Sequence, residues 1–181
     1  FADDGKLIAI DNVGYVYLYD SYTGSLLRQD SMDVTGYPVK LASISPDGSG
    51  MVAWTSFSSV GLYTLSQKGW SETGRTDFNP SMIFYSKDGT SVYIASDSEM
   101  QKRNSSDLSL ISGYSFPAGY IRSVDIDHDR FFLSYIASPG NLLIELNTGK
   151  VIDTIPGWIT NCRPFNNYLI TSGRQLMLPQ F

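Results

Sequence analysis

Short apolar runs alternate with small polar breaks along this chain, and the succession repeats at a regular interval. Each repeat contains an apolar run, a break rich in Gly, Asp, Asn and Ser, and then a run of alternating side chains, clearest in residues 16–19 and 142–146. β-Branched and aromatic residues at a period of two are typical of half-buried strands. No segment sustains a helical period. The sequence therefore predicts an all-β fold.

A short turn motif marks the repeats. Residues 45–48 (SPDG), 86–89 (SKDG) and 127–130 (DHDR) stand 41 residues apart, and residues 2–5 (ADDG) form an earlier copy. A period of about 20 to 50 residues indicates a repeat architecture. We expect Gly48 and Gly89 to have a positive φ, because the last position of such a tight link favours a left-handed backbone.

A second turn closes each alternating strand, at residues 23–24, 68–69 and 148–149, and a short outer strand then leads into the next copy. Four short strands in every 41 residues, separated by turn-forming residues, predict the four-stranded blade of a β-propeller. The blades are expected to start near residues 1, 37, 78, 119 and 158 of a single domain that covers residues 1–181.

The ends of the chain leave the blade number open. Counting strands gives three, then three blades of four, then three more, which is about four and a half blades. Phe1 aligns with the last apolar residue before each turn, so the first blade starts inside a strand. We favour an incomplete propeller, completed by missing blades or by a second chain. The alternative is a complete five-bladed ring in which the terminal segments pair.

Two stretches of the repeat resemble a known family. Residues 44–48 (ISPDG) and 146–155 (LNTGKVIDTI) are similar to the YVTN family of β-propeller repeats, and the resemblance covers essentially the whole chain. The related WD-repeat class fits less well, since the sequence has no Trp-Asp pair and Tyr19-Asp20 is the most similar dipeptide. The resemblance implies the propeller fold. It leaves function open, because such propellers serve as surface proteins, enzyme domains and binding platforms.

Composition narrows the classes of partner. With 13 basic and 18 acidic residues the net charge is −5, which argues against nucleic acid, whose phosphates attract clustered Lys and Arg. No run is long and apolar enough to span a bilayer. Few lysines with many Ser, Tyr, Thr and Asn favour an extracytoplasmic or cell-envelope protein.

Candidate chemistry is sparse, and no cofactor is expected. The single cysteine, Cys162, is expected in an inner strand as a small buried side chain, and the single histidine, His128, in an exposed turn. Asp125 and Asp127 would share one face of a strand and could hold calcium. However, Asp127 aligns with the turn residues Ser45 and Ser86. We therefore favour turn chemistry over a metal site.

The best functional lead is a row of aromatic residues at one rim of the propeller. Residues Tyr37, Phe78, Tyr120 and Trp158 recur near the repeat period, each where an outer strand leads into the next inner strand. Polar residues are expected beside them on the same face: Asn12, Asp33, Asp77, Asp97 and Asn141. Such a ring could bind a peptide loop or stack on sugars. The alternative, which we favour, is that each aromatic side chain packs between blades.

Three classes of function are consistent with these patterns. The leading interpretation is a noncatalytic propeller that acts as a protein-interaction or surface-scaffold module with a protein partner. An alternative is the propeller domain of a lactonase-like or quinoprotein-like enzyme, for which the inner strands offer only Arg122, Arg163 and scattered Asp. A carbohydrate-binding surface protein is the third.

Overall fold

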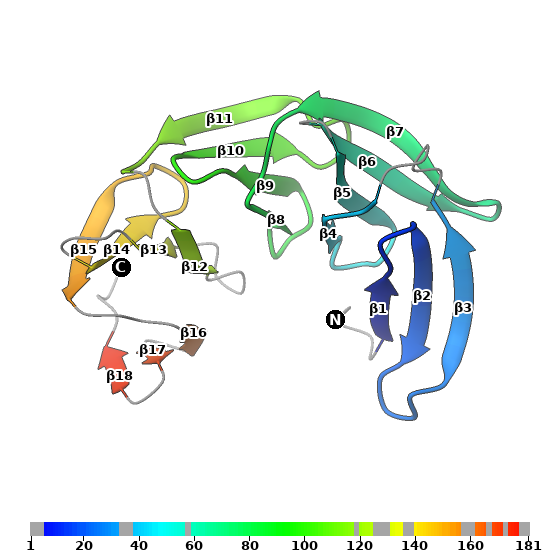
Figure 1. Ribbon diagram of the computed structural model, residues 1–181, viewed down its shortest axis with the longest axis horizontal. Coiled ribbons are helices and arrows are strands. Elements are labelled where there is room, and N and C mark those ends of the chain that lie inside the picture. The colour runs from blue at the N-terminus through cyan, green and yellow to red at the C-terminus, as the bar shows by residue number, and fades with distance from the viewer. Residues whose placement is uncertain are drawn as a thin grey trace. The chain divides into compact units, whose positions relative to one another are not determined.

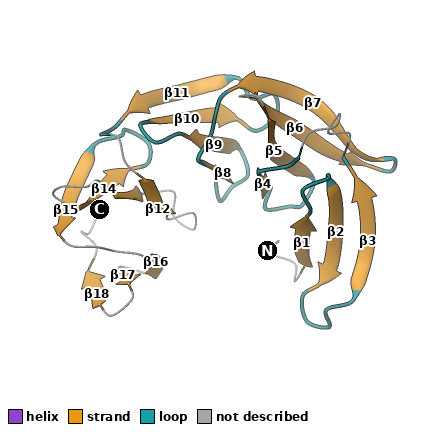
Figure 2. Cartoon of the chain, in the orientation of Figure 1, coloured by secondary structure: helices purple, strands orange, loops and turns teal. Residues whose placement is uncertain are grey.

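The computed structural model describes residues 6–32, 38–56, 59–117, 120–124, 131–135, 140–156, 162–165, 168–171 and 174–177. Within these ranges the chain forms strands, turns and bends and contains no helix, as Figure 2 shows. The predicted all-β class is therefore confirmed.

The strands form antiparallel sheets in which neighbours follow one another along the sequence (Figure 1). Sheet 1 contains β1 (Lys6–Ile10), β2 (Tyr15–Asp20) and β3 (Leu26–Ser31). Sheet 2 contains β4 (Leu41–Ile44), β5 (Gly50–Ser56), β6 (Ser59–Ser66) and β7 (Gly69–Asp77). Sheet 3 contains β8 (Met82–Tyr85), β9 (Ser91–Ala95), β10 (Glu99–Asn104) and β11 (Leu110–Ser115).

Two further sheets complete the described part of the chain. Sheet 4 contains β12 (Tyr120–Val124), β13 (Phe131–Tyr135), β14 (Gly140–Glu145) and β15 (Val151–Pro156). Sheet 5 contains β16 (Cys162–Phe165), β17 (Tyr168–Thr171) and β18 (Arg174–Met177). Among the described residues the sheets thus have three, four, four, four and three strands, which is the succession that the repeat predicted.

The chain divides into two compact units. Unit 1 comprises Phe1–Ile94 and Gln101–Ser112, and unit 2 comprises Ala95–Met100 and Gly113–Phe181. Sheets 1 and 2 belong to unit 1 and sheets 4 and 5 to unit 2, while sheet 3 contributes to both.

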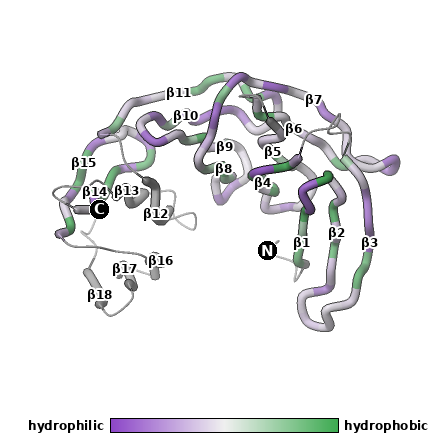
Figure 3. The backbone as a smooth tube through the Cα atoms, in the orientation of Figure 1, coloured by the Kyte–Doolittle hydropathy of each residue, from purple (hydrophilic) through white to green (hydrophobic). Residues whose placement is uncertain are grey.

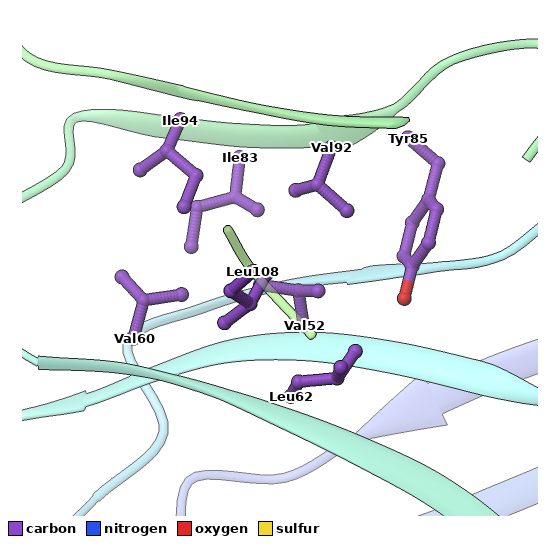
Figure 4. Packing of buried hydrophobic residues seen from close by; sticks show 8 residues of the cluster. All are labelled: Val52, Val60, Leu62, Ile83, Tyr85, Val92, Ile94 and Leu108. Carbon is purple, nitrogen blue, oxygen red and sulfur yellow. The ribbon is translucent and has the colours of Figure 1, made fainter. Parts of the chain in front are cut away.

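Unit 1 is held together by two apolar clusters, one on each face of sheet 2. Val52, Val60 and Leu62 pack toward sheet 3, where Ile83 and Ile94 are among their partners (Figure 4). A second cluster lies on the side of sheet 1. It contains Met51, Ala53, Tyr63, Trp70, Val16 and Met32. Successive residues of β5 therefore face opposite neighbours, because side chains alternate across a strand.

The repeated turn has the geometry that the sequence predicts. The backbone N–H of Gly48 donates to the oxygen of Ser45 at 2.9 Å, and that of Gly89 donates to the oxygen of Ser86 at 3.0 Å. The φ angles of the two glycines are 74° and 71°. The prediction of positive φ at both positions is confirmed.

The second turn of the repeat contains an exception. Gly24 and Gly149 close their turns with φ of 69° and 71°, and their N–H groups donate to the oxygens of Asp20 and Glu145. In sheet 3 the same position is held by Leu108, which has a φ of 59°. Its side chain is buried in the cluster between sheets 2 and 3. Burial in this cluster offsets a backbone conformation that leucine seldom adopts.

Unit 2 follows the same pattern. The side chains of Leu142, Leu143, Ile144 and Leu146 are buried on and just after β14. The outer strands are more polar: residues 28–30 of β3 in unit 1, for example, form a hydrophilic stretch that is purple in Figure 3. Among the residues whose burial is described, the strands in the middle of sheets 2, 3 and 4 are thus more buried than the outer strands β7, β11 and β15.

Candidate binding rim

The strands of each sheet alternate in direction, so its loops gather at two ends. In sheet 2, the β4–β5 and β6–β7 turns lie at one end, which we call the turn end. The end of β5, the start of β6 and the connection that follows β7 lie at the other end, which we call the rim. The sequence placed its candidate recognition residues at the rim.

Hydrogen bonds join the two kinds of rim loop within each unit. In unit 1, the N–H of Val39, which precedes β4, donates to the oxygen of Asn12 in the β1–β2 loop at 3.0 Å. In unit 2, the N–H of Phe116, which follows β11, donates to the oxygen of Ser98 in the β9–β10 loop at 2.9 Å. The connections between sheets are therefore fixed to the loops beside them.

Phe78 lies at the rim of sheet 2, directly after β7. Its ring is partly buried and packs against the cluster between sheets 2 and 3. The preceding residue, Asp77, is exposed and pairs across the sheet with Ser59. Phe78 thus packs between sheets with one part of its ring and remains exposed to solvent with the rest.

Two residues that the sequence did not single out join Phe78 at this rim. The ammonium group of Lys40 lies 4.4 Å above the centre of the Trp54 indole ring, in a cation–π contact. The N–H of Lys40 also donates to the oxygen of Trp54 at 2.9 Å. Trp54 and Leu41 pack, like Phe78, against the cluster between sheets 2 and 3. We call the residues Lys40, Trp54, Asp77 and Phe78 the rim patch.

The indole of Trp54 carries a further signal. Its Nε1 atom is buried and has no hydrogen-bond partner among the described residues. Buried polar groups usually form hydrogen bonds. At this N–H, the packing of the indole ring against the cluster therefore offsets the cost of a missing hydrogen bond. The sequence alone showed no sign of the contact between Lys40 and Trp54, because the two residues come together only through the pairing of β4 with β5.

The other predicted rim residues lie in different surroundings. Asn12 and Asp97 are exposed in the β1–β2 and β9–β10 loops. Asn141 is fully buried, and its Nδ2 donates to the oxygen of Ile155 at 3.3 Å. Because β14 begins at Gly140, Asn141 already belongs to the sheet and presents no open surface.

Several predicted residues lie outside the part of the chain that can be described. These are Tyr37, Trp158, Asp33, Asp125, Asp127 and His128. Tyr120 is the first residue of β12, and Cys162 is the first residue of β16, where it pairs with Thr171. The ring of four aromatic residues stays a prediction.

At the turn end, the acidic residues are engaged by their own turns. The Oγ of Ser45 donates to Asp47 at 2.5 Å, and the Oγ of Ser86 donates to Asp88 at 2.7 Å. These hydrogen bonds, with others from Ser49 and Thr90, hold the pKa of both carboxyl groups below their usual range. Within the described ranges, no group of three or more His, Cys, Asp or Glu residues is placed to hold a metal ion.

Comparison with known proteins gives the fold. No protein family and no curated protein matches this sequence. Among solved structures, the crystal structure of BamB from Moraxella catarrhalis resembles it at 15% sequence identity with a TM-score of 0.59. The likeness covers 94% of this chain and 56% of the BamB chain. In the part of the chain that the structure describes, no helix has the length and hydrophobicity needed to cross a membrane. With its succession of antiparallel sheets, the chain has the fold of a β-propeller.

Proposed function

We propose that this chain is a noncatalytic β-propeller module that binds a protein partner at its rim. The observation that carries the proposal is the rim patch, in which a cation, an exposed carboxylate and two partly exposed aromatic rings lie at one end of sheet 2. Tryptophan and other aromatic side chains are enriched at the centres of protein interfaces, where they supply much of the binding energy. The propeller fold supports the proposal, since it presents such loops on a rigid set of sheets.

We also propose that the repeats are of the YVTN type and that the module serves as a surface scaffold in the cell envelope. Residues 44–48 and 146–155 support the first point. The low lysine content, with abundant Ser, Thr, Tyr and Asn, supports the second. Fractionation of source cells, followed by detection of the protein, tests the compartment.

Site-specific cross-linking tests the binding proposal. A photoreactive amino acid is placed at Lys40 or at Asp77, and in a control protein at Tyr22. Tyr22 is 88% exposed and lies in the β2–β3 turn, at the turn end of sheet 1. We expect one protein from source extracts to cross-link from the two rim positions and not from Tyr22.

Affinity measurements with the purified partner then decide the matter. Lys40→Ala and Asp77→Ala should each weaken binding by about 1 to 2 kcal/mol, the size of an interface contact near a hot spot. Tyr22→Ala should bind with the affinity of the unaltered protein. A partner that cross-links equally from Tyr22, or that binds both rim variants with unchanged affinity, would contradict the proposal.

A further inference from the structure

A cavity lies at the turn end of unit 1, between sheets 2 and 3, and has a volume of about 450 Å³. The two matching turns that carry Asp47 and Asp88 form part of its wall. Ser105 and Ser106, from the turn between β10 and β11, form another part. Its lining includes none of the rim patch, so binding in this cavity does not depend on the proposed function.

Tyr85 places a buried hydroxyl in the wall of this cavity. The residue ends β8, is 4% exposed, and packs within the cluster between sheets 2 and 3 (Figure 4). The hydroxyl oxygen lies 3.1 Å from the point where a Cβ on Gly50 would stand, and the Oγ of Ser45 lies 3.4 Å from the same point. No described residue forms a hydrogen bond with this hydroxyl. Because an unmade buried hydrogen bond is unfavourable, a group in the cavity that reached this hydroxyl would be stabilised by bonding to it.

The two carboxylates of the wall have capacity to accept further hydrogen bonds. Oδ2 of Asp47 accepts from Ser49 Oγ at 2.7 Å, and Oδ2 of Asp88 accepts from Thr90 Oγ1 at 2.9 Å. The Oδ1 atoms also accept hydrogen bonds from their own turns, but among the described residues each Oδ2 accepts only that one bond and, with two lone pairs, retains room for another donor. Both have a lowered pKa and are therefore ionised at neutral pH.

The charge of this cavity differs from that of its neighbour. Between sheets 1 and 2 lies a cavity of about 250 Å³ that shares Asp47 but includes Arg28, whose Nε pairs with Asp30 at 2.7 Å. In the larger cavity, none of the described lining residues is basic. Lys102 lowers the pKa of Asp88 from outside the lining, beside the ring of Tyr93. The larger cavity therefore lacks the internal cation of its neighbour.

We propose that the cavity between sheets 2 and 3 binds an alkylammonium group, the cation at the end of a lysine side chain or of a free amine. An ammonium group has three N–H donors and no acceptor. These donors match the carboxylates of Asp47 and Asp88 and the hydroxyl oxygen of Tyr85. Pro46, which also lines the cavity and is only partly buried, offers an apolar surface to the alkyl stem.

Titration of the isotope-labelled chain, followed by NMR, tests the proposal. The probes are Nα-acetyl-lysine methylamide, which represents a protein side chain, and putrescine, which represents a free amine. Tetramethylammonium serves as a cation without N–H donors. We expect saturable shifts of the Gly48 and Gly89 amide signals with one or both amines, and none with tetramethylammonium. The amine that binds more tightly identifies the source.

Matched variants assign the binding to this cavity. Asp88→Asn should weaken amine binding about tenfold, because a charge-assisted hydrogen bond becomes a neutral one. Tyr85→Phe, which keeps the shape of the ring, should weaken it about threefold through loss of one acceptor. Asp97→Asn removes an exposed acidic residue at the rim and should leave the affinity unchanged.

Three results would overturn the proposal: no saturable shift with either amine, equal shifts with tetramethylammonium, or unchanged affinity in both Asp88→Asn and Tyr85→Phe. Asp88 also bonds within its own turn, so the spectrum of each variant is first compared with that of the unaltered chain. Tyr85→Phe removes no hydrogen bond between described residues, so it tests the site even if Asp88→Asn disturbs the turn.

Discussion

The ring of Tyr114 lies over Gly149, so closely that a Cβ on Gly149 would collide with Cδ2 of the ring. The hydroxyl of Tyr114 donates a hydrogen bond of 2.5 Å to the backbone oxygen of Leu146, directly after β14. An outer strand of sheet 3 is thereby fastened to the turn between β14 and β15 within unit 2. Glycine is required here both by its backbone conformation and by the ring that covers it.

Replacing Gly149 with alanine should therefore be more costly than the same change at Gly24. Both glycines have a positive φ, and at Gly24 no other atom lies within 4 Å of an added Cβ. Gly24→Ala should lower the free energy of unfolding by about 1 to 2 kcal/mol, the cost of a left-handed backbone. Gly149→Ala should lose a further 1 to 3 kcal/mol or so, because the tyrosine ring must move. Urea denaturation measures both values.

The double variant Tyr114→Ala with Gly149→Ala identifies the cause of the difference. Without the ring, Gly149→Ala should lower the free energy of unfolding only by the cost of the left-handed backbone, as at Gly24. Equal falls in the free energy of unfolding for Gly24→Ala and Gly149→Ala in the otherwise unaltered chain would show that the Tyr114 ring moves aside at no cost.

At Leu108 a side chain is favoured although the backbone conformation is not, because the side chain is buried while φ is 59°. Leu108→Gly should relieve about 1 kcal/mol of backbone strain and lose about 2 to 5 kcal/mol of buried packing. We expect a net fall in the free energy of unfolding, measured by urea denaturation. A more stable variant would mean that the leucine contributes little to the cluster between sheets 2 and 3.

The turn acids predict a definite dependence of stability on pH. Hydrogen bonds from Ser45 and Ser49 lower the folded-state pKa of Asp47 below its ordinary value of 3.8. The stabilising effect is therefore complete above pH 3.8 and is lost as pH falls through the folded-state pKa. Asp47→Ala should lower the free energy of unfolding at pH 7 by about 1 kcal/mol, the usual net value of such hydrogen bonds.

Denaturation curves at several pH values check this prediction. The gap between Asp47→Ala and the unaltered chain should narrow as the solution is acidified below pH 3.8. A gap that stays constant into the acid range would show that the ionised carboxylate is not the stabilising form.

Phe78→Ala separates packing from recognition at the rim. The ring is partly buried against the cluster between sheets 2 and 3, so its removal should lower the free energy of unfolding by about 2 to 4 kcal/mol, somewhat less than for a fully buried ring. Asp97→Ala, at an exposed rim position, should change stability by less than about 0.5 kcal/mol. Similar stabilities for the two variants would argue that Phe78 is a recognition residue alone.

Local patterns in the sequence were sufficient to predict the strands and the first turn. Gly48 and Gly89 lie within motifs whose conformation depends on neighbours a few residues away, so their positive φ could be read directly. Leu108 could not be foreseen, because it breaks the glycine pattern of its turn. Its conformation is explained by the apolar cluster that buries its side chain, whose other members come from β5, β6, β8 and β9.

The candidate sites depended more on pairing between distant segments. Lys40 and Trp54 meet because β4 pairs with β5, and the hydroxyl of Tyr85 meets Gly50 because two sheets pack together. Asn141 was expected in an open loop, but β14 begins one residue before it and encloses its side chain. Turn spacing predicts where loops fall to within a residue or two, and that margin decides whether a side chain is open or enclosed.

The two clusters on either face of sheet 2 should also govern how slowly its amide hydrogens exchange with solvent. Opening β5 or β6 exposes both clusters at once, whereas opening β1 exposes only one of them. The amides of β5 and β6 are accordingly expected to be the slowest to exchange in unit 1. The rim patch is built on the ends of these strands and their neighbours in sheet 2, so a partner would meet a preordered surface and little conformational entropy would be lost on binding.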